Sequence, residues 1–298
     1  MTPLPNFLLI GAAKAGTTAL FATLDQHPDV YFAGNKEPSY FAWMEQSLDV
    51  RGPGDWAALS PYVVTRWADY ARLFANAGTA TAIGEASTAY LYHPYAAARI
   101  AHALPDARLI AILRHPADRA YAAYLHLLRD GRETLDFAAA LRAEPERIAQ
   151  GWEPLWHYRQ MGAYAAQLRR YLAHFERARL HVCLYDDFQA DPTATARRIF
   201  AFLGVEDSFT PALPHRTNVG GVPRGEPLYR LLAAARWKRA RQRIPPGLRH
   251  RYRRLLNAWP LRRPPLPPQL RANLTATFRD DILHLQDLLQ RDLSAWLG

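Results

Sequence analysis

The stretch Phe7-Leu8-Leu9-Ile10-Gly11-Ala12-Ala13-Lys14-Ala15-Gly16-Thr17-Thr18-Ala19-Leu20 lies near the start of the chain. Its four leading apolar residues predict a buried strand. The small residues that follow predict a tight turn around Lys14, and the chain then continues as a helix over residues 19–24. A strand, a small-residue loop and a helix N-terminus form an anion site, because free backbone N–H groups and the helix dipole both favour a phosphate or sulfate.

The order of the residues in this loop narrows the class of anion. A Walker A loop requires G-x-x-x-x-G-K-[ST], whereas Lys14 here precedes Gly16, so that motif does not match. The order Lys-x-Gly-Thr-Thr after a strand resembles the 5′-phosphosulfate loop of sulfotransferases that use 3′-phosphoadenosine 5′-phosphosulfate (PAPS). The resemblance implies that Lys14 and the backbone N–H groups of Ala15, Gly16, Thr17 and Thr18 hold the phosphosulfate. It also implies that Lys14 stabilises the leaving group. The alternative is an ordinary strand–turn–helix junction with a solvated lysine.

The length and composition of the chain limit the classes of protein to which it can belong. The 298 residues, 49% of them hydrophobic, suffice for one large α/β domain or two small ones. No run of 18 apolar residues suggests a membrane span, and the first residues lack a signal-peptide pattern. A single cysteine, Cys183, excludes an internal disulfide and a cysteine metal cluster, and it reads as inert core. We therefore expect a cytoplasmic protein without a transmembrane segment.

Strand-like and helix-like segments alternate along the chain. Strands are expected at 7–10, 28–32, 81–85, 108–113 and 180–185, and helices at 19–24, 56–75, 95–104, 117–129, 135–150, 156–175, 192–203 and 270–297. This alternation predicts a three-layer α/β fold, with a central parallel sheet flanked by helices. Ligands of such sheets bind at the carboxyl ends of the strands, which is where Lys14, Glu37, Glu85 and Arg114 fall. Together with the loop, the pattern resembles the P-loop NTPase-like fold of sulfotransferases.

A second motif, Arg114-His115-Pro116-Ala117-Asp118-Arg119-Ala120-Tyr121-Ala122-Ala123-Tyr124, follows the clearest buried strand. An arginine between a strand end and a helix can bind a second phosphate bidentately. The motif resembles R-x-P-x-x-R-A-Y-S-x-Y of carbohydrate-type sulfotransferases, whose arginine and serine bind the 3′-phosphate. Arg114 matches the arginine, but the serine position is Ala122, so one hydrogen bond is missing. The alternative for Arg114 is a structural ion pair, and Arg119 is expected to be structural.

Two acidic segments supply candidates for the acceptor side. In Lys36-Glu37-Pro38-Ser39-Tyr40-Phe41, Glu37 takes the place of the family's general base before an aromatic pair. A positioned base typically accelerates a reaction by ~10²–10⁴-fold. The alternative is an exposed loop glutamate. In Glu85-Ala86-Ser87-Thr88-Ala89-Tyr90, which resembles the family's E-K-[ST]-x-x-Y, Glu85 and Ser87 are candidate acceptor contacts, although the lysine is replaced by alanine.

The last part of the chain is basic and rich in proline. From Arg224 to Arg271 it has 14 Lys and Arg against one acid, a charge of +13 that leaves −3 for the rest of a +10 chain. Such a basic block can bind an anionic glycan or an acidic lipid surface; the alternative is a segment that is simply exposed to solvent. The loop Asn218-Val219-Gly220-Gly221-Val222-Pro223-Arg224 resembles a bacterial sulfotransferase loop and implies that Arg224 clamps the 3′-phosphate; the alternative is a surface turn. We expect one domain, 1–298, with an insertion at about 225–268.

The histidines show no metal-ligand spacing, so no metal is expected; His115 and His126 are reserve candidates for a base. The resemblance spans nearly the whole chain and implies transfer of a sulfuryl group from PAPS, which leaves the 3′,5′-bisphosphate PAP. The acceptor is a hydroxyl or amine of a carbohydrate, lipid or small molecule. Two other functions stay open. One is a P-loop nucleotide kinase or NTPase, which needs ATP and Mg²⁺. The other is nucleic-acid binding through 224–271, which lacks a recognition motif.

Overall fold

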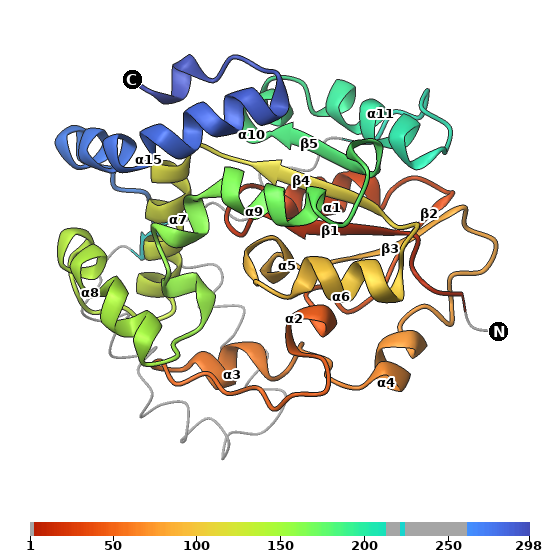
Figure 1. Cartoon of the computed structure of the whole chain (residues 1–298), viewed down its shortest axis with the longest axis horizontal. Helices are drawn as coiled ribbons and strands as arrows, with labels where there is room; N and C mark the ends of the chain where they lie inside the picture. Colours follow the sequence, from red (N-terminus) through yellow and green to blue (C-terminus); the bar gives the residue numbers. More distant parts are fainter. Residues whose placement is uncertain (1–2, 213–220, 224–260) are drawn as a thin grey trace.

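A computed structural model gives the fold and describes residues 3–212, 221–223 and 261–298 (Figure 1). Its centre is a five-stranded sheet with the order β2-β3-β1-β4-β5, and every pairing in it is parallel. The strands are β1 (Phe7–Gly11), β2 (Val30–Phe32), β3 (Ala82–Ala86), β4 (Arg108–Leu113) and β5 (Leu180–Leu184). The predicted parallel α/β sheet is therefore confirmed.

Helices cover both faces of the sheet. They are α1 (Thr17–Leu24), α2 (Tyr40–Trp43), α3 (Asp55–Leu59), α4 (Trp67–Arg72), α5 (Ala89–Tyr92), α6 (Ala96–Ala103), α7 (Pro116–Arg129), α8 (Phe137–Ala149), α9 (Tyr164–Leu172), α10 (Tyr185–Ala190), α11 (Pro192–Leu203) and α15 (Pro268–Leu289). Short 3₁₀ turns lie at 154–156, 160–162, 177–179 and 294–296.

The two cores follow the alternation of side chains along the central strands. Leu8 and Ile10 of β1 join the core under α5, α6, α7, α9 and α15. Phe7 and Leu9 join the opposite core under α1, α10 and α11. All five residues of β1 are buried, as expected for a central parallel strand with helices on both faces. Figure 1 shows the sheet between these two sets of helices, which makes the three layers.

The expected helix over 56–75 is wrong: the structure has two short helices, α3 and α4, with an irregular link between them. Pro61 contributes to the break, because it has no backbone N–H with which to continue the hydrogen bonding of α3. The link pairs with another loop instead, since the Val64 N–H donates to the Pro38 carbonyl at 2.8 Å. This pairing holds the link beside the loop that carries Glu37.

The expected helix over 156–175 begins only at Tyr164, after two 3₁₀ turns. The buried carboxylate of Glu144 accepts the backbone N–H groups of Arg159 and Gln160 at 2.8 and 3.1 Å, so these groups serve a side chain rather than a helix. A Cβ at Gly162 would lie 2.7 Å from the Phe278 ring, so this turn also lets α15 approach closely.

Two two-residue strands form a second, antiparallel ladder, in which β6 (Val222–Pro223), just before the basic segment, pairs with β7 (Leu261–Arg262) within it. Most of the predicted insertion at 225–268 lies outside the described residues, and the single domain over 1–298 stays a prediction. The last helix, α15, packs on α7 and α9. None of the helices in the described ranges is long and apolar enough to cross a membrane.

Candidate active site

The site forms where all five parallel strands end. The loops that follow them carry Lys14 after β1, Glu37 after β2, Thr88 after β3, Arg114 after β4 and Tyr185 after β5. Strand β1 lies between β3 and β4, so the chain leaves β1 towards one edge of the sheet and later crosses to the other. Such a reversal opens a crevice at the carboxyl ends of the strands, which is where ligands bind in this fold class.

The loop around Lys14 has the backbone shape of an anion cradle. Lys14 adopts φ 67° and Gly16 φ 102°, both left-handed. Such turns direct successive N–H groups into one concavity. Among the residues that the structure describes, no side chain caps the start of α1, so its first N–H groups keep their capacity for a ligand. A Cβ at Gly16 would lie 2.6 Å from the Tyr185 ring, so only glycine fits both the backbone angle and the space.

The ammonium of Lys14 is a cation in a half-buried position. Burial first, and then the charge of Arg129, lower the pKa of Lys14 to about 8, although Asp130 and Glu37 oppose the shift. None of the described residues hydrogen-bonds or ion-pairs with this ammonium. A desolvated cation of this kind is stabilised by an anionic ligand, which would raise its pKa again. The geometry therefore fits the phosphosulfate expected from the sequence.

Glu37 lies beside this cradle and is held from two sides. Its Oε2 accepts hydrogen bonds from the Thr88 N–H at 2.7 Å and the Thr88 hydroxyl at 3.1 Å. Its Oε1 lies 3.2 Å from the Nζ of Lys36, which also donates to the Thr18 hydroxyl at 3.3 Å. The Glu37 side chain remains 33% exposed, so the carboxylate is both fixed and accessible. Lys36 thus joins the candidate base to the donor loop.

Glu85 and Ser87 lie at the end of β3, as the sequence predicts, but beneath the surface. Both are fully buried, so neither offers a surface to an acceptor, and the structure does not support the expected acceptor contacts. The Ser87 hydroxyl instead donates to the Glu85 carboxylate at 2.7 Å. The two side chains pack under the loop of Glu37, against Tyr70 of α4 and Tyr90 of α5. The sequence pattern alone could not distinguish a residue at the site from one beneath it.

Arg114 follows β4, and its guanidinium lies 3.5 Å from the Lys14 carbonyl oxygen and 4.9 Å from the centre of the Tyr185 ring. A cavity of about 250 Å³ opens beside it, lined by Arg114, Asp118, Tyr121, Arg263, Pro264, Pro265 and Leu266. Burial, followed by the charge of Arg263, lowers the pKa of Arg114. Two guanidinium groups that face one cavity repel each other until an anion lies between them. Arg224 falls outside the described residues.

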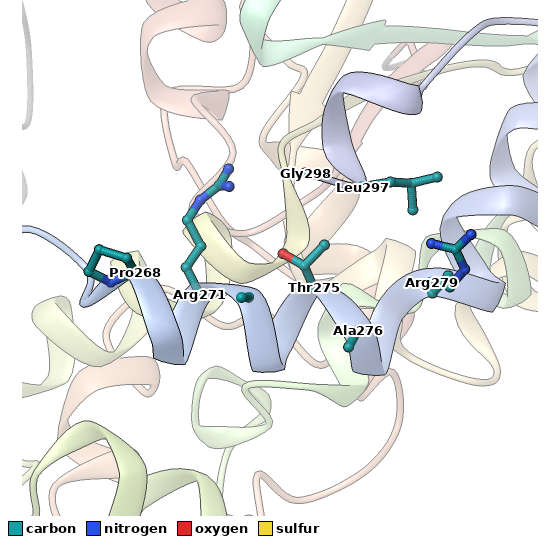
Figure 2. A pocket seen from close by; sticks show the side chains of 8 residues that line it. Pro268, Arg271, Thr275, Ala276, Arg279, Leu297 and Gly298 are labelled. Carbon is teal, nitrogen blue, oxygen red and sulfur yellow. The ribbon is translucent and has the colours of Figure 1, made fainter.

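A further hollow of about 310 Å³ runs along the first half of α15, where Leu297 and Gly298 form its far wall (Figure 2). Figure 2 shows Thr275 between Arg271 and Arg279 on the side of the helix that faces this wall. Arg271 pairs with Asp118 at 3.2 Å, so this ion pair separates the hollow from the cavity beside Arg114. None of the residues predicted for the site lines the hollow.

The two reserve histidines are occupied by other partners. The Nδ1 of His126 lies 2.9 Å from the guanidinium of Arg129, and its Nε2 lies 3.4 Å from Asp130. Burial and then the charge of Lys14 lower the pKa of His126 to about 3, which leaves the imidazole neutral. His115 is buried, and its Nε2 bonds the Trp296 carbonyl at 3.0 Å. Neither histidine offers a base as accessible as Glu37. The described residues also contain no group of three or more His, Cys, Asp or Glu that could hold a metal.

A buried ionic network joins α3 to the chain that follows α7. Asp55 at the start of α3 is fully buried and bonds the guanidinium of Arg132, the indole N–H of Trp156 and the N–H of Glu153. Arg132 also pairs with the carboxylate of Glu153. The network fixes α3 to the chain just after α7, whose last residues adjoin Lys14. Sequence reasoning missed it, because its members are far apart in the chain.

Four residues of the site had no role in the sequence-based prediction: Lys36, Thr88, Tyr185 and Arg263. Lys36 and Thr88 lie next to predicted residues, and adjacency to the motifs was the only available signal. Arg263 is one of many cations in the basic segment, so composition could not single it out.

Comparisons with known proteins agree with this geometry. The model of the sulfotransferase family matches residues 5–211. Bifunctional heparan sulfate N-deacetylase/N-sulfotransferase 4 of Mus musculus is 31% identical over 210 residues, which cover 68% of this chain and 22% of that protein. Heparan sulfate glucosamine 3-O-sulfotransferase 3B1 of Homo sapiens is 28% identical over 207 residues, which cover 70% of this chain and 48% of that protein. The chain thus spans between about a fifth and a half of these relatives.

The crystal structure of a sulfotransferase from Alicyclobacillus acidocaldarius superposes with a TM-score of 0.80 at 37% identity. The match covers 99% of this chain and 100% of the other. Family model, relatives and solved structure all match, so the chain belongs to the PAPS-dependent sulfotransferase family.

Proposed function

We propose that this chain transfers the sulfuryl group of PAPS to a hydroxyl or amine of a carbohydrate acceptor, with Glu37 as the general base. The observation that carries the proposal is the contact of Lys36 with both Thr18 and Glu37, at 3.3 and 3.2 Å. Through it an accessible carboxylate lies beside the loop that suits the phosphosulfate. A base must be within reach of the proton that it removes, and this position meets that condition.

The donor would bind along the crevice. Lys14 and the N–H groups of residues 15–18 hold the 5′-phosphosulfate, while Arg114 and Arg263 hold the 3′-phosphate. Support comes from the free ammonium of Lys14 and from the two guanidinium groups around one cavity. Arg263 would offset the hydroxyl that is missing at Ala122, and Arg224 would add a further cation.

The reaction needs one proton acceptor and one charge stabiliser. The acceptor oxygen or nitrogen attacks sulfur, its proton passes to Glu37, and the bond from sulfur to the 5′-phosphate oxygen breaks. The negative charge that develops on the leaving phosphate lies against the Lys14 ammonium. Loss of one preorganised donor of this kind typically costs about 10²–10³ in rate.

A carbohydrate is the proposed acceptor because the two relatives named above act, by their names, on heparan sulfate. An exposed aromatic residue, Tyr62, is hydrogen-bonded to the segment just before the base. Tyr62 is 47% exposed, and its carbonyl accepts a hydrogen bond from the Asn35 side chain at 2.8 Å. Asn35 precedes Glu37 by two residues, so an acceptor that reaches the base passes near this ring.

The alternatives of a nucleotide kinase and of a nucleic-acid-binding protein are not favoured, since the family model and the relatives are sulfotransferases. The test compares stabilisation of the protein by PAP, by ATP with Mg²⁺ and by DNA in thermal unfolding, and then assays sulfate transfer from PAPS to sugars, phenols and lipids. PAP alone should stabilise the protein strongly. Stabilisation by ATP with Mg²⁺ but not by PAP would overturn the proposal.

The role of Glu37 has its own test. Glu37→Gln keeps the size and hydrogen bonding of the side chain but removes the base, so transfer should fall by about 10²–10⁴-fold. The thermal shift produced by PAP should stay unchanged, because Glu37 does not contact the donor phosphates in this arrangement. Normal turnover by this variant would show that another residue is the base.

A further inference from the structure

A carboxyl group that the proposed mechanism does not use lies under the base loop. Glu85, at the end of β3, has no exposed surface. Its Oε2 accepts the Ser87 hydroxyl at 2.7 Å, its Oε1 accepts the Tyr70 hydroxyl at 3.3 Å, and the Tyr90 hydroxyl also bonds the carboxyl. A carboxylate offers about four lone-pair sites to donors, so three hydroxyls can point at it together.

Two of these hydroxyls also bind the backbone of the base loop. The Ser87 oxygen accepts the N–H of Ser39 at 2.8 Å, and the Tyr90 oxygen accepts the N–H of Phe41 at 3.4 Å. A hydroxyl carries a single proton. Because its oxygen faces a backbone N–H, each of these hydroxyls must direct its own proton elsewhere. The Ser87 hydroxyl donates to Glu85, and the Tyr90 hydroxyl lies within hydrogen-bond reach of both Glu85 and Ser87. The carboxylate thus fixes the rotation of the groups that hold Ser39 and Phe41.

The loop needs such support because its backbone is strained. Glu37 has φ 69° and Ser39 φ 50°, a region that residues with a Cβ seldom adopt. Such conformations persist where the surroundings over-determine them. The Glu37 N–H donates to the Ala86 carbonyl at 2.9 Å, and Thr88 holds the Glu37 carboxylate. Residues 85–88 therefore bind the loop through both its backbone and its acid.

From these contacts we propose that Glu85 is a positioning residue: through the hydroxyls of Ser87 and Tyr90 it holds the Glu37 loop in the geometry that places the base beside the donor. This inference rests on the proposed role of Glu37 as base. Glu85 itself touches neither substrate nor donor. Its effect reaches the reaction only through the loop, so it should change turnover rather than donor binding.

The charge of Glu85 gives the arrangement a dependence on pH. Burial, only partly offset by the three hydroxyls, raises the pKa of Glu85 to about 7. The titratable groups that face it are Tyr70 from α4, Tyr90 from α5, Tyr171 from α9 and Glu37 from the loop. Burial raises the pKa of each tyrosine, so these remain neutral, and Glu37 is the one charge among them. Protonated Glu85 carries a donor where the hydroxyls need an acceptor.

The first test uses a matched pair of variants. Tyr90→Phe and Tyr70→Phe each remove one hydroxyl that donates to Glu85, but only the Tyr90 hydroxyl also holds a backbone N–H of the loop. Tyr90→Phe should lower kcat by about 10- to 100-fold, the scale of a misplaced reacting group, with an unchanged KM for PAPS and an unchanged PAP thermal shift. Tyr70→Phe should lose far less. Equal kcat values for the two variants would overturn the proposal.

Ser87 gives an independent check. Ser87→Ala leaves the Ser39 N–H buried without its partner and should also lower kcat without a change in the KM for PAPS, whereas Ser87→Thr keeps the hydroxyl and should restore much of the loss. If Ser87→Ala fails to fold, the tyrosine pair decides. If Ser87→Thr is as impaired as a folded Ser87→Ala variant, the result would contradict the role of the Ser87 hydroxyl in positioning the loop.

Glu85→Gln separates the charge from the shape. The amide brings a permanent donor, so kcat at pH 8 should be low, and the pH profile of kcat should lack the step near pH 7 that is expected for wild type. Tyr70→Phe should keep a step. An unchanged profile in Glu85→Gln would contradict the proposal. These outcomes can be told apart from a failure of the proposed function, since a fully active Glu37→Gln variant would refute the role of Glu37 as the base. If Glu37→Gln is inactive but the Ser87 and Tyr90 variants are fully active, only the positioning role of Glu85 is refuted.

Discussion

Lys14 should make the affinity for PAP depend on pH in a way that a single substitution abolishes. In the free protein its pKa is about 8, because burial and Arg129 disfavour the charged form. Between pH 7 and pH 9 its protonated fraction therefore falls from about nine-tenths to about one-tenth. A bound 5′-phosphate stays dianionic over this range. Bound phosphate should restore the pKa of Lys14 towards its ordinary value of 10.5, so binding at pH 9 must take up a proton.

The magnitude follows from this linkage. Because Lys14 must first be protonated at pH 9, the binding free energy of PAP should be about 1.4 kcal/mol less favourable at pH 9 than at pH 7. This difference corresponds to about tenfold weaker binding. Calorimetric titration at pH 7, 8 and 9, in two buffers with different ionisation enthalpies, gives both the dissociation constant and the proton uptake. Uptake should approach one proton at pH 9 and should be small at pH 7.

Two substitutions identify the group responsible. Lys14→Met removes the charge, so PAP binding should weaken at all pH values and should lose the Lys14-dependent slope. Lys14→Arg keeps a charge that does not titrate in this range, so it should bind without a slope of this origin. A wild-type affinity that is constant from pH 7 to pH 9, or a slope that persists in Lys14→Met, would refute the assignment of the buried ammonium to the phosphate.

Three further predictions concern the other parts of the site. Arg263→Ala should weaken PAP by about 1.5–3 kcal/mol, the range for a hydrogen bond to a charged group, yet leave adenosine 5′-phosphate unaffected; equal losses in equilibrium titrations would exclude a 3′-phosphate role. Tyr62→Ala should raise the KM of a sugar acceptor about three- to tenfold, as expected for one lost ring contact, whereas Tyr62→Phe should leave it unchanged. Steady-state assays at a fixed PAPS concentration measure this KM, and an unchanged KM in Tyr62→Ala would contradict the prediction. Asp55→Ala should lower the free energy of unfolding by about 3–5 kcal/mol because it breaks a buried ion pair with Arg132; a urea-measured loss below about 1 kcal/mol would show that the network relaxes.

Most of the architecture was predictable because the strands carry their own signal. Residues 108–113 are apolar after Arg108, and the observed strand has the same bounds. The helices of 56–75 and 156–175 were not predictable to the same degree, since their breaks depend on distant partners. Glu144, for example, binds the N–H groups of Arg159 and Gln160, and no local pattern reveals that contact.

The candidate site divides along a similar line. Lys14, Glu37 and Arg114 were predictable because each lies in a motif at a strand end, and the structure gathers all three at one edge of the sheet. Motifs do not report burial, so they could not show that Glu85 and Ser87, the candidate acceptor contacts, are both buried. The contacts of Lys36 are equally invisible in sequence, because its partners Thr18 and Glu37 meet only after the first two loops fold together.

The small ladder of β6 and β7 has a consequence for how this family can diversify. Pro223 pairs with Leu261, so the chain that leaves the body at one point returns to the same point. The entropy of closing a loop rises only slowly with its length, by about 0.6 kcal/mol for each doubling. A change in the number of residues between these two anchors therefore adds little closure entropy, while Arg114 and the Lys14 cradle stay where the parallel sheet holds them. The length of this stretch can vary without moving the cradle, provided that Arg224, the proposed additional cation, is kept.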